Sequence, residues 1–204
     1  MIHQMTIACP FDIEEYIHVV QSFHGYKAPG VIIGGFMVNL GKGHLSEGTL
    51  FNAICETPVC LPDAIQLLTP CTIGNNRLKI LNFGRFALSL FDKDQGNGFR
   101  VFLDPEKIDE WPEIKNWFFK IKSKAEQNME LLMAQIKEGG ETLCGIHPIR
   151  VRPELIKKEK RGEICAVSVL PGSLSFQRWE GLSWLPGSIS LCSYRSLRGA
   201  YFNI

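Results

Sequence analysis

The chain has 204 residues, and its hydrophobic share of 45% suits a globular protein of one or two domains. Its 22 Lys and Arg residues nearly balance its 21 Asp and Glu residues, so the net charge of +1 gives no general electrostatic basis for nucleic-acid binding. No hydrophobic run reaches the length of a membrane span, and the N-terminal residues lack the pattern of a secretory signal. We therefore expect a cytoplasmic protein whose seven cysteines are thiols or metal ligands rather than disulfides.

Two helices are predicted in the first part of the chain. Apolar residues recur at helical spacing over residues 11–23, and His24 continues this buried face. Gly25 suits the position directly after a helix end. A second helix is expected to begin at Pro29, which favours a first helical turn. His24 at the end of the first helix can be a core residue bonded to a backbone carbonyl or a metal ligand.

The stretch from Cys60 to Gly74 places one thiol on each side of a short predicted helix. A strand over residues 50–56 leads into Cys60, and the helix is expected over residues 62–68. A helix of this length spans about 12 Å, so Cys60 and Cys71 can meet only if the following loop folds back.

Zinc and related ions are bound by thiolates and imidazoles gathered from separate places in a chain. His24, Cys60 and Cys71 can form such a set if the first helix ends beside the helix between the two cysteines. Asp63 or Glu56 can then act as a general base, as a partner that orients a ligand, or as a fourth ligand. The cysteine spacing matches no zinc motif, so two buried thiols or a redox pair are alternative interpretations.

Further short strands and one long helix complete the first part of the chain. The strands are predicted over residues 78–82, 85–91, 99–103 and 143–152. The first three are expected to pair as an antiparallel meander. Ser123 and Glu126 form a capping-box pattern that predicts the start of the helix. Together these elements predict an α+β fold with a mixed sheet of about five strands flanked by helices.

The composition changes near residue 155, where a charged segment precedes a stretch that is almost free of charge. We expect a core domain over residues 1–155, which holds the metal or active site, and a small C-terminal domain over residues 156–204.

Several short motifs occur in one order, namely Phe23-His24-Gly25, Ala28-Pro29-Gly30, Cys60-x-x-Asp63-Ala64-Ile65-Gln66, Thr69-Pro70-Cys71-Thr72-Ile73-Gly74 and Gly84-Arg85-Phe86. In this order they resemble the formylmethanofuran dehydrogenase FmdE family over about residues 10–155. The resemblance implies a thioredoxin-like core with a mixed sheet. It also implies a site at His24, Cys60 and Cys71 for zinc or another divalent transition metal.

The chain departs from the family pattern at two places. Tyr26 and Ala28 stand where relatives often have His and Cys, which predicts a reduced set of metal ligands. Relatives also often carry a C-terminal zinc finger of treble-clef type with two Cys-x-x-Cys pairs. Here Cys165 and Cys192 are the single remaining thiols of those pairs, which indicates a degenerate finger, from a diverged or frameshifted segment over residues 165–198.

The resemblance implies a metal-binding protein related to formylmethanofuran dehydrogenase and to methanogenesis in anaerobes, and leaves open whether it is an enzyme. The alternative is a non-enzymatic assembly or binding module for subunits of a molybdenum or tungsten oxidoreductase, docked through Trp179 and Trp184 of the tail. Thiol redox chemistry is a third interpretation, which the absence of a Cys-x-x-Cys motif disfavours. A homodimer is expected, because small α+β units with an exposed sheet edge often pair.

Overall fold

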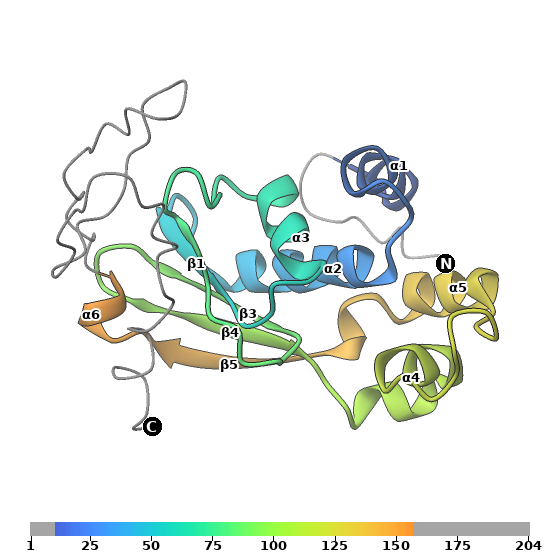
Figure 1. Ribbon diagram of the computed structural model, residues 1–204. Coiled ribbons are helices and arrows are strands. Elements are labelled where there is room, and N and C mark those ends of the chain that lie inside the picture. Colours follow the sequence, from blue (N-terminus) through green and yellow to red (C-terminus); the bar gives the residue numbers. More distant parts are fainter. Residues whose placement is uncertain (1–10, 157–204) are drawn as a thin grey trace, which may run out of the picture. The chain divides into compact units, whose positions relative to one another are not determined.

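The structure is a computed structural model that describes residues 11–156, which form a sheet with helices packed against it (Figure 1). The sheet has five strands in the order β2-β1-β3-β4-β5. β1 and β2 run parallel, and every other neighbouring pair runs antiparallel. The strands are β1 (Phe51–Cys55), β2 (Leu78–Ile80), β3 (Ala87–Asp92), β4 (Asn97–Leu103) and β5 (Cys144–Arg150). The predicted mixed sheet of five strands with flanking helices is confirmed.

The first two helices are α1 (Ile13–His24) and α2 (Pro29–His44), close to their predicted bounds. Asp12 caps α1 by accepting hydrogen bonds from the backbone N–H groups of its first turn. Gly25 ends α1 in the left-handed conformation, with φ of 93°. This sharp end turns the chain directly into α2 and fixes the position of His24.

The predicted meander is wrong at its first strand. β2 pairs in parallel with β1 rather than with β3, because α3 (Leu61–Leu68) and the loop after it form a crossover between β1 and β2. The segment after β2 is not a tight hairpin. Its backbone N–H groups at Phe83 and Arg85 donate to the Glu56 carbonyl over 3.0 and 3.4 Å.

The capping-box pattern at Ser123 forms, but it does not open a helix. Glu126 accepts hydrogen bonds from the Ser123 backbone N–H and hydroxyl over 3.0 and 2.7 Å within an isolated turn. The helix starts later, because Asn128 supplies the cap by accepting from the Leu131 N–H. The remaining helical elements are η1 (Lys107–Glu110), α4 (Pro112–Phe118), α5 (Met129–Gly139), η2 (Gly140–Leu143) and α6 (Pro153–Ile156).

The main core lies between one face of the sheet and α2, with α1 and α3 on the same side (Figure 1). Residues of the central strands alternate, so that Ala53, Cys55, Leu88 and Leu90 face this core. α2 is buried along almost its whole length, and Gly34 lets α3 approach closely, since a Cβ there would lie 2.7 Å from Ala64 Cβ. The close contact of α2 with α3 positions the first turn of α3.

The other face of the sheet carries a smaller apolar cluster of Ile54, Phe91 and Val151. Among the helices of residues 11–156, none is long and apolar enough to cross a membrane. The predicted C-terminal domain, with Cys165 and Cys192, lies outside the described residues.

Candidate functional site

His24 and Asp63 form a direct contact between the last residue of α1 and the first turn of α3. The distance from His24 Nδ1 to Asp63 Oδ2 is 2.6 Å, and the side chains are 18% and 30% exposed. An ionised carboxylate only accepts hydrogen bonds, so Nδ1 carries the proton and donates it. The other ring nitrogen, Nε2, is therefore free to act as a metal ligand or as a base.

Tyr16 of α1 is buried near the Asp63 carboxylate. Its hydroxyl donates to the Val31 carbonyl over 2.9 Å, and its side chain is fully buried. Burial and the negative charge of Asp63 both raise the pKa of Tyr16 well above its ordinary value. The phenol therefore stays neutral, and Asp63 is the charged group beside His24.

Cys60 stands at a strained turn between β1 and α3. Its φ of 59° and ψ of −56° lie in a region that side-chain-bearing residues rarely adopt. The Leu61 N–H donates to the Val59 carbonyl over 2.6 Å, which closes a γ-turn around Cys60. Gly30 of α2 makes room for the thiol, since a Cβ there would lie 3.2 Å from Cys60 Sγ and 2.9 Å from its Cβ.

The charge environment of Cys60 favours the protonated thiol. Burial raises its pKa, and the negative charge of Asp63 raises it further, while Lys124 opposes both by lowering it. A metal bound through Cys60 must therefore displace the thiol proton.

Cys71 lies at the opposite end of α3. Its buried thiol donates to the Phe51 carbonyl over 3.4 Å, and Phe51 begins the strand β1 that ends before Cys60. The loop does not fold back toward Cys60, because Asn75 holds it in its own turn by donating to the Pro70 carbonyl over 2.8 Å. The structure therefore brings Cys60 and Asp63 to one end of α3 and places Cys71 at the other.

Glu56 is engaged in a structural pair. Its carboxylate oxygens accept from Arg100 Nε and a terminal guanidinium nitrogen over 2.5 and 2.8 Å. The hydrogen bonds to Glu56 raise the pKa of Arg100. Both oxygens of Glu56 accept hydrogen bonds from Arg100, so the geometry gives this residue a structural role.

The predicted set of three metal ligands is not assembled in this arrangement. Residues 11–156 contain no group of three or more His, Cys, Asp and Glu side chains that could hold a metal ion. In residues 11–156, His24, Cys60 and Cys71 therefore do not form a preassembled metal site. Two donors remain at the first turn of α3, the imidazole that Asp63 orients and the Cys60 thiol.

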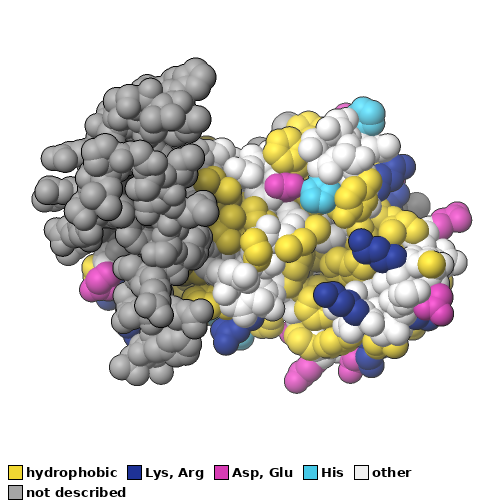
Figure 2. All heavy atoms as spheres, in the orientation of Figure 1, with side chains coloured by type: hydrophobic (Ala, Val, Ile, Leu, Met, Phe, Trp, Pro, Cys, Tyr) yellow, Lys and Arg dark blue, Asp and Glu magenta, His cyan; other side chains and the backbone are white. Residues whose placement is uncertain are grey.

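Tyr26 and Ala28 occupy the positions where the sequence predicted a loss of ligands. Ala28 is buried and precedes α2, whereas Tyr26 is 53% exposed and its ring lies 5.0 Å from that of His24. Figure 2 shows a histidine and an acidic side chain among hydrophobic side chains on one face, with Lys or Arg side chains nearby. The hydrophobic side chains close in sequence to the site include Phe23 and Val59, which are 55% and 62% exposed.

Two cavities of the described residues lie elsewhere. One of about 450 Å³ is bordered by the turn between β3 and β4 and by the end of β5. A smaller one of about 190 Å³ lies at the end of α2, beside His44 and Glu141.

Sequence reasoning missed three residues around Cys60. Gly30 stood in a quoted motif, but its contact with the thiol depends on how α2 packs on α3. Phe86 also lies near this glycine, 3.5 Å from a Cβ built there. Lys124 gave no signal, because it stands in a loop among other lysines.

Residues 23–148, more than half of the chain, match the family described as FmdE, molybdenum formylmethanofuran dehydrogenase operon. A crystal structure of a tungsten formylmethanofuran dehydrogenase FmdE-like protein from Syntrophus aciditrophicus is 44% identical, with a TM-score of 0.74. That match covers 86% of this chain and 91% of the other.

A curated relative from Archaeoglobus fulgidus is named a probable S-adenosyl-L-methionine-binding protein. It is 33% identical over 96 residues, and the match covers 43% of this chain but only 26% of the relative. The family match covers the segment that carries His24, Cys60 and Asp63. The chain therefore belongs to the FmdE family.

Proposed function

We propose that the protein binds zinc or another divalent transition metal through His24 and Cys60, and that it serves a formylmethanofuran dehydrogenase. The observation that carries the proposal is the 2.6 Å contact between His24 Nδ1 and Asp63. A carboxylate on one ring nitrogen fixes the tautomer and makes the other nitrogen a better metal donor. The family match over residues 23–148 supports the link to the dehydrogenase.

Each side chain has a defined part in this proposal. Asp63 orients the imidazole and keeps the proton on Nδ1, while Gly30 and the Phe86 ring leave Cys60 in a partly desolvated place. A bound divalent ion supplies a Lewis acid or an activated water. Two protein donors leave other coordination positions for a ligand, for solvent or for a further side chain. Cys71 is the least supported of the predicted ligands, because it bonds to Phe51 at the other end of α3.

A cobalt titration of the purified protein tests the metal proposal. Cobalt(II) bound by a thiolate gives a sulfur-to-metal charge-transfer band, which reports the sulfur ligand directly. We expect the band in the wild type, its loss in Cys60→Ser and about a tenfold or larger loss of affinity in His24→Gln. Cys71→Ser is the matched control, and it should keep the band. A band that survives Cys60→Ser and disappears in Cys71→Ser contradicts the assignment.

Asp63→Asn tests whether Asp63 binds the metal itself or orients the His24 imidazole. The amide keeps the size of the side chain but removes the charge that orients the imidazole. We expect the charge-transfer band to remain, with cobalt affinity reduced by about 10- to 100-fold. Unchanged affinity would exclude the orienting role.

A second function, as an assembly module for a molybdenum or tungsten oxidoreductase, is favoured by the exposed apolar side chains near the site. Phe23, Tyr26 and Val59 are each more than half exposed. Val59→Asp should weaken co-purification with such an oxidoreductase and leave cobalt binding intact. Undiminished association removes this surface from the docking role.

The sequence resemblance also supports a thioredoxin-like core and a degenerate zinc finger, and composition supports a cytoplasmic location. The homodimer stays an expectation from the exposed sheet edge.

A further inference from the structure

The C-terminal end of α2 brings a second imidazole and a carboxylate to one cavity. This cavity of about 190 Å³ is bordered by Asn39, Leu40, Gly43, His44 and Glu141. Since α2 rises about 1.5 Å per residue, its last residue lies about 20 Å from Gly30, which contacts Cys60. The cavity is therefore separate from the proposed site at His24 and Cys60.

The imidazole of His44 has a defined tautomer. Its Nδ1 lies 2.8 Å from the Leu40 carbonyl oxygen. A carbonyl oxygen only accepts hydrogen bonds, so in the neutral ring Nδ1 carries the proton and Nε2 keeps its lone pair. The ring also lies beside that of Phe99, with 5.3 Å between the centroids. These two contacts orient the ring and leave Nε2 for a ligand.

The carboxylate of Glu141 is oriented by a neutral partner. The side-chain amide of Asn39 donates to its Oε1 atom. Within residues 11–156, none of the ion pairs includes Glu141 or His44. The carboxylate therefore keeps its negative charge, and Oε2 can bind a cation.

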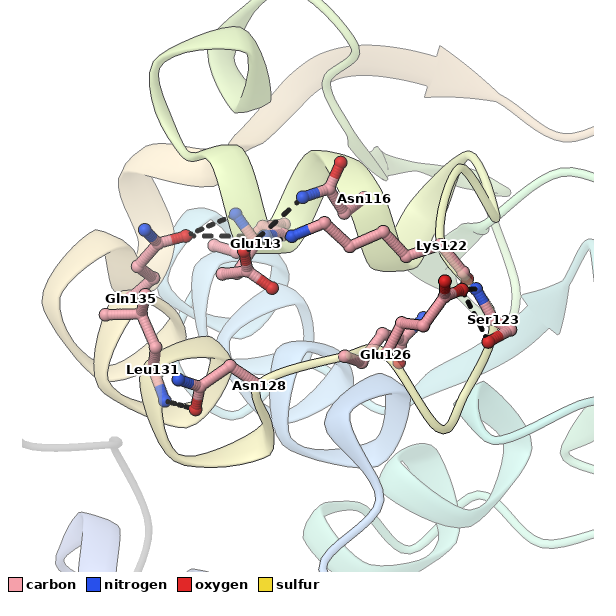
Figure 3. A network of polar contacts seen from close by, with 10 residues as sticks. Glu113, Asn116, Lys122, Ser123, Glu126, Asn128, Leu131 and Gln135 are labelled. Atoms are coloured by element: carbon pink, nitrogen blue, oxygen red, sulfur yellow. Dashed lines mark hydrogen bonds and ion pairs between the residues drawn. The ribbon is translucent and has the colours of Figure 1, made fainter.

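The segment that carries Glu141 is anchored within η2 and through α5. The Thr142 hydroxyl donates to the last carbonyl of α5 over 2.6 Å. α5 is in turn joined to α4, because Gln135 accepts from the backbone N–H groups of Glu113 and Ile114 over 2.9 and 3.3 Å (Figure 3). A carboxylate held in this way binds an ion without first ordering a loop.

The charges around the cavity favour a cation. The C-terminal end of a helix carries a partial negative charge, to which Glu141 adds a full one. Lys42 in the last turn of α2 donates to the Leu68 carbonyl over 3.4 Å and does not border the cavity. Its ammonium therefore does not occupy the place of the cation.

We propose that this cavity binds a divalent transition metal through His44 Nε2 and Glu141. An imidazole favours first-row transition metals over magnesium and calcium, and a carboxylate adds an oxygen ligand. Water molecules, of about 30 Å³ each, complete the coordination, and the cavity has room for several of them. The site has no sulfur ligand and shares no residue with the proposed site at Cys60.

Protection of His44 by zinc tests the site in the full-length protein after treatment with a chelator. Diethyl pyrocarbonate acylates an imidazole nitrogen that carries a lone pair, so a metal bound to Nε2 blocks the reaction. Peptide mass spectrometry reports the rate at each histidine separately. We expect zinc to protect His44 and to leave the rate at His147 unchanged. His147 is exposed on β5 and pairs in register with Arg100, which repels a cation.

Glu141→Gln should raise the zinc concentration that half-protects His44 by at least about tenfold, because even the loss of a residue that only orients a ligand costs that much. Glu138→Gln is the matched control on the exposed side of α5, and it should leave this concentration unchanged. Urea unfolding checks that both variants are folded. Equal protection of His44 and His147, or an unchanged half-protecting concentration in Glu141→Gln, overturns the inference.

A crystal grown with zinc gives a second readout that needs no variant. We expect an anomalous peak bonded to His44 Nε2 and a Glu141 oxygen, and its absence with zinc in excess would contradict the site. Cys60→Ser should leave the protection of His44 unchanged, because the two sites share no ligand. Protection of His44 that persists when cobalt fails to bind Cys60 would count against the proposed function alone.

Discussion

Cys60 shows how a single residue is held in an unfavourable conformation by its neighbours. The γ-turn around it costs about 1–3 kcal/mol, and such strain persists only where the surrounding structure fixes it. Gly30 is part of that surrounding structure, because its missing Cβ leaves the space that the thiol fills. The position of the sulfur therefore depends on a residue in a different helix.

Gly30→Ala is expected to destabilise the protein by about 1–3 kcal/mol, because the added methyl group would overlap Cys60. Gly43 in the same helix has open space around its Cα, so Gly43→Ala should be neutral or stabilising by up to about 1 kcal/mol. Urea unfolding of the two variants measures both changes. Equal stability of the two variants would contradict the role of Gly30.

Buried thiols also predict how stability changes with pH. Burial raises the pKa of Cys55 to about 11 and that of Cys144 to about 12, above the value of about 8.5 for a thiol in the unfolded chain. The unfolded state then loses its thiol protons first. The stabilisation is complete below about pH 8.5 and is lost as the pH rises toward the folded-state values.

The free energy of unfolding should therefore fall between about pH 9 and about pH 11, by up to about 1.4 kcal/mol per pH unit for each thiol. Cys144→Ala should make this fall shallower, whatever its effect at neutral pH. Denaturant unfolding at several pH values gives the slope. A slope that is the same in Cys144→Ala and the wild type would show that this thiol does not contribute.

The candidate site was predictable from sequence only in part. His24 was placed at a helix end by the spacing of apolar residues, and Cys60 by the strand and proline around it. The separation of Cys71 was not predictable, because it depends on the turn that Asn75 forms with Pro70.

At the scale of elements, Glu56 and Arg100 join two strands that are not neighbours. Glu56 follows β1 and Arg100 lies in β4, and both of these strands pair with β3. Arg100 also lies over the Phe102 ring, 5.3 Å from its centroid. The pair therefore connects β1 and β4 across β3, on the sheet face opposite the main core.

Glu56→Gln should destabilise the protein by about 2–3 kcal/mol, because it leaves the partly buried Arg100 without its charged partner. It should not weaken cobalt binding, since the carboxylate of Glu56 is held by Arg100. Glu138→Gln on the exposed side of α5 is the control and should change little. A loss of cobalt affinity in Glu56→Gln would restore Glu56 as a site residue.

Sequence patterns predicted the helices better than the strand pairing. Helical spacing, Pro29 and Gly25 marked α1 and α2 close to their true bounds. The pairing of β2 with β1 was missed, because a crossover and a meander can share the same order of short strands. The capping box at Ser123 misplaced the start of α5, because such a box also closes an isolated turn.

At the scale of the whole molecule, residues 11–156 are organised around α2. This helix packs on the sheet, on α1 and on α3, so it connects the end of α1 that carries His24 with the start of α3 that carries Cys60 and Asp63. The family was predictable because most of its short motifs lie at the ends of α1, α2 and α3, where these helices pack together.

The most direct test is an anomalous difference map from a crystal of the full-length protein grown with zinc and measured at the zinc absorption edge. We expect a peak bonded to His24 Nε2 and Cys60 Sγ, with Asp63 still on Nδ1. We expect no peak bonded to Cys71. A peak coordinated by Cys71, or no peak at His24 and Cys60 with zinc in excess, would contradict the proposed metal site.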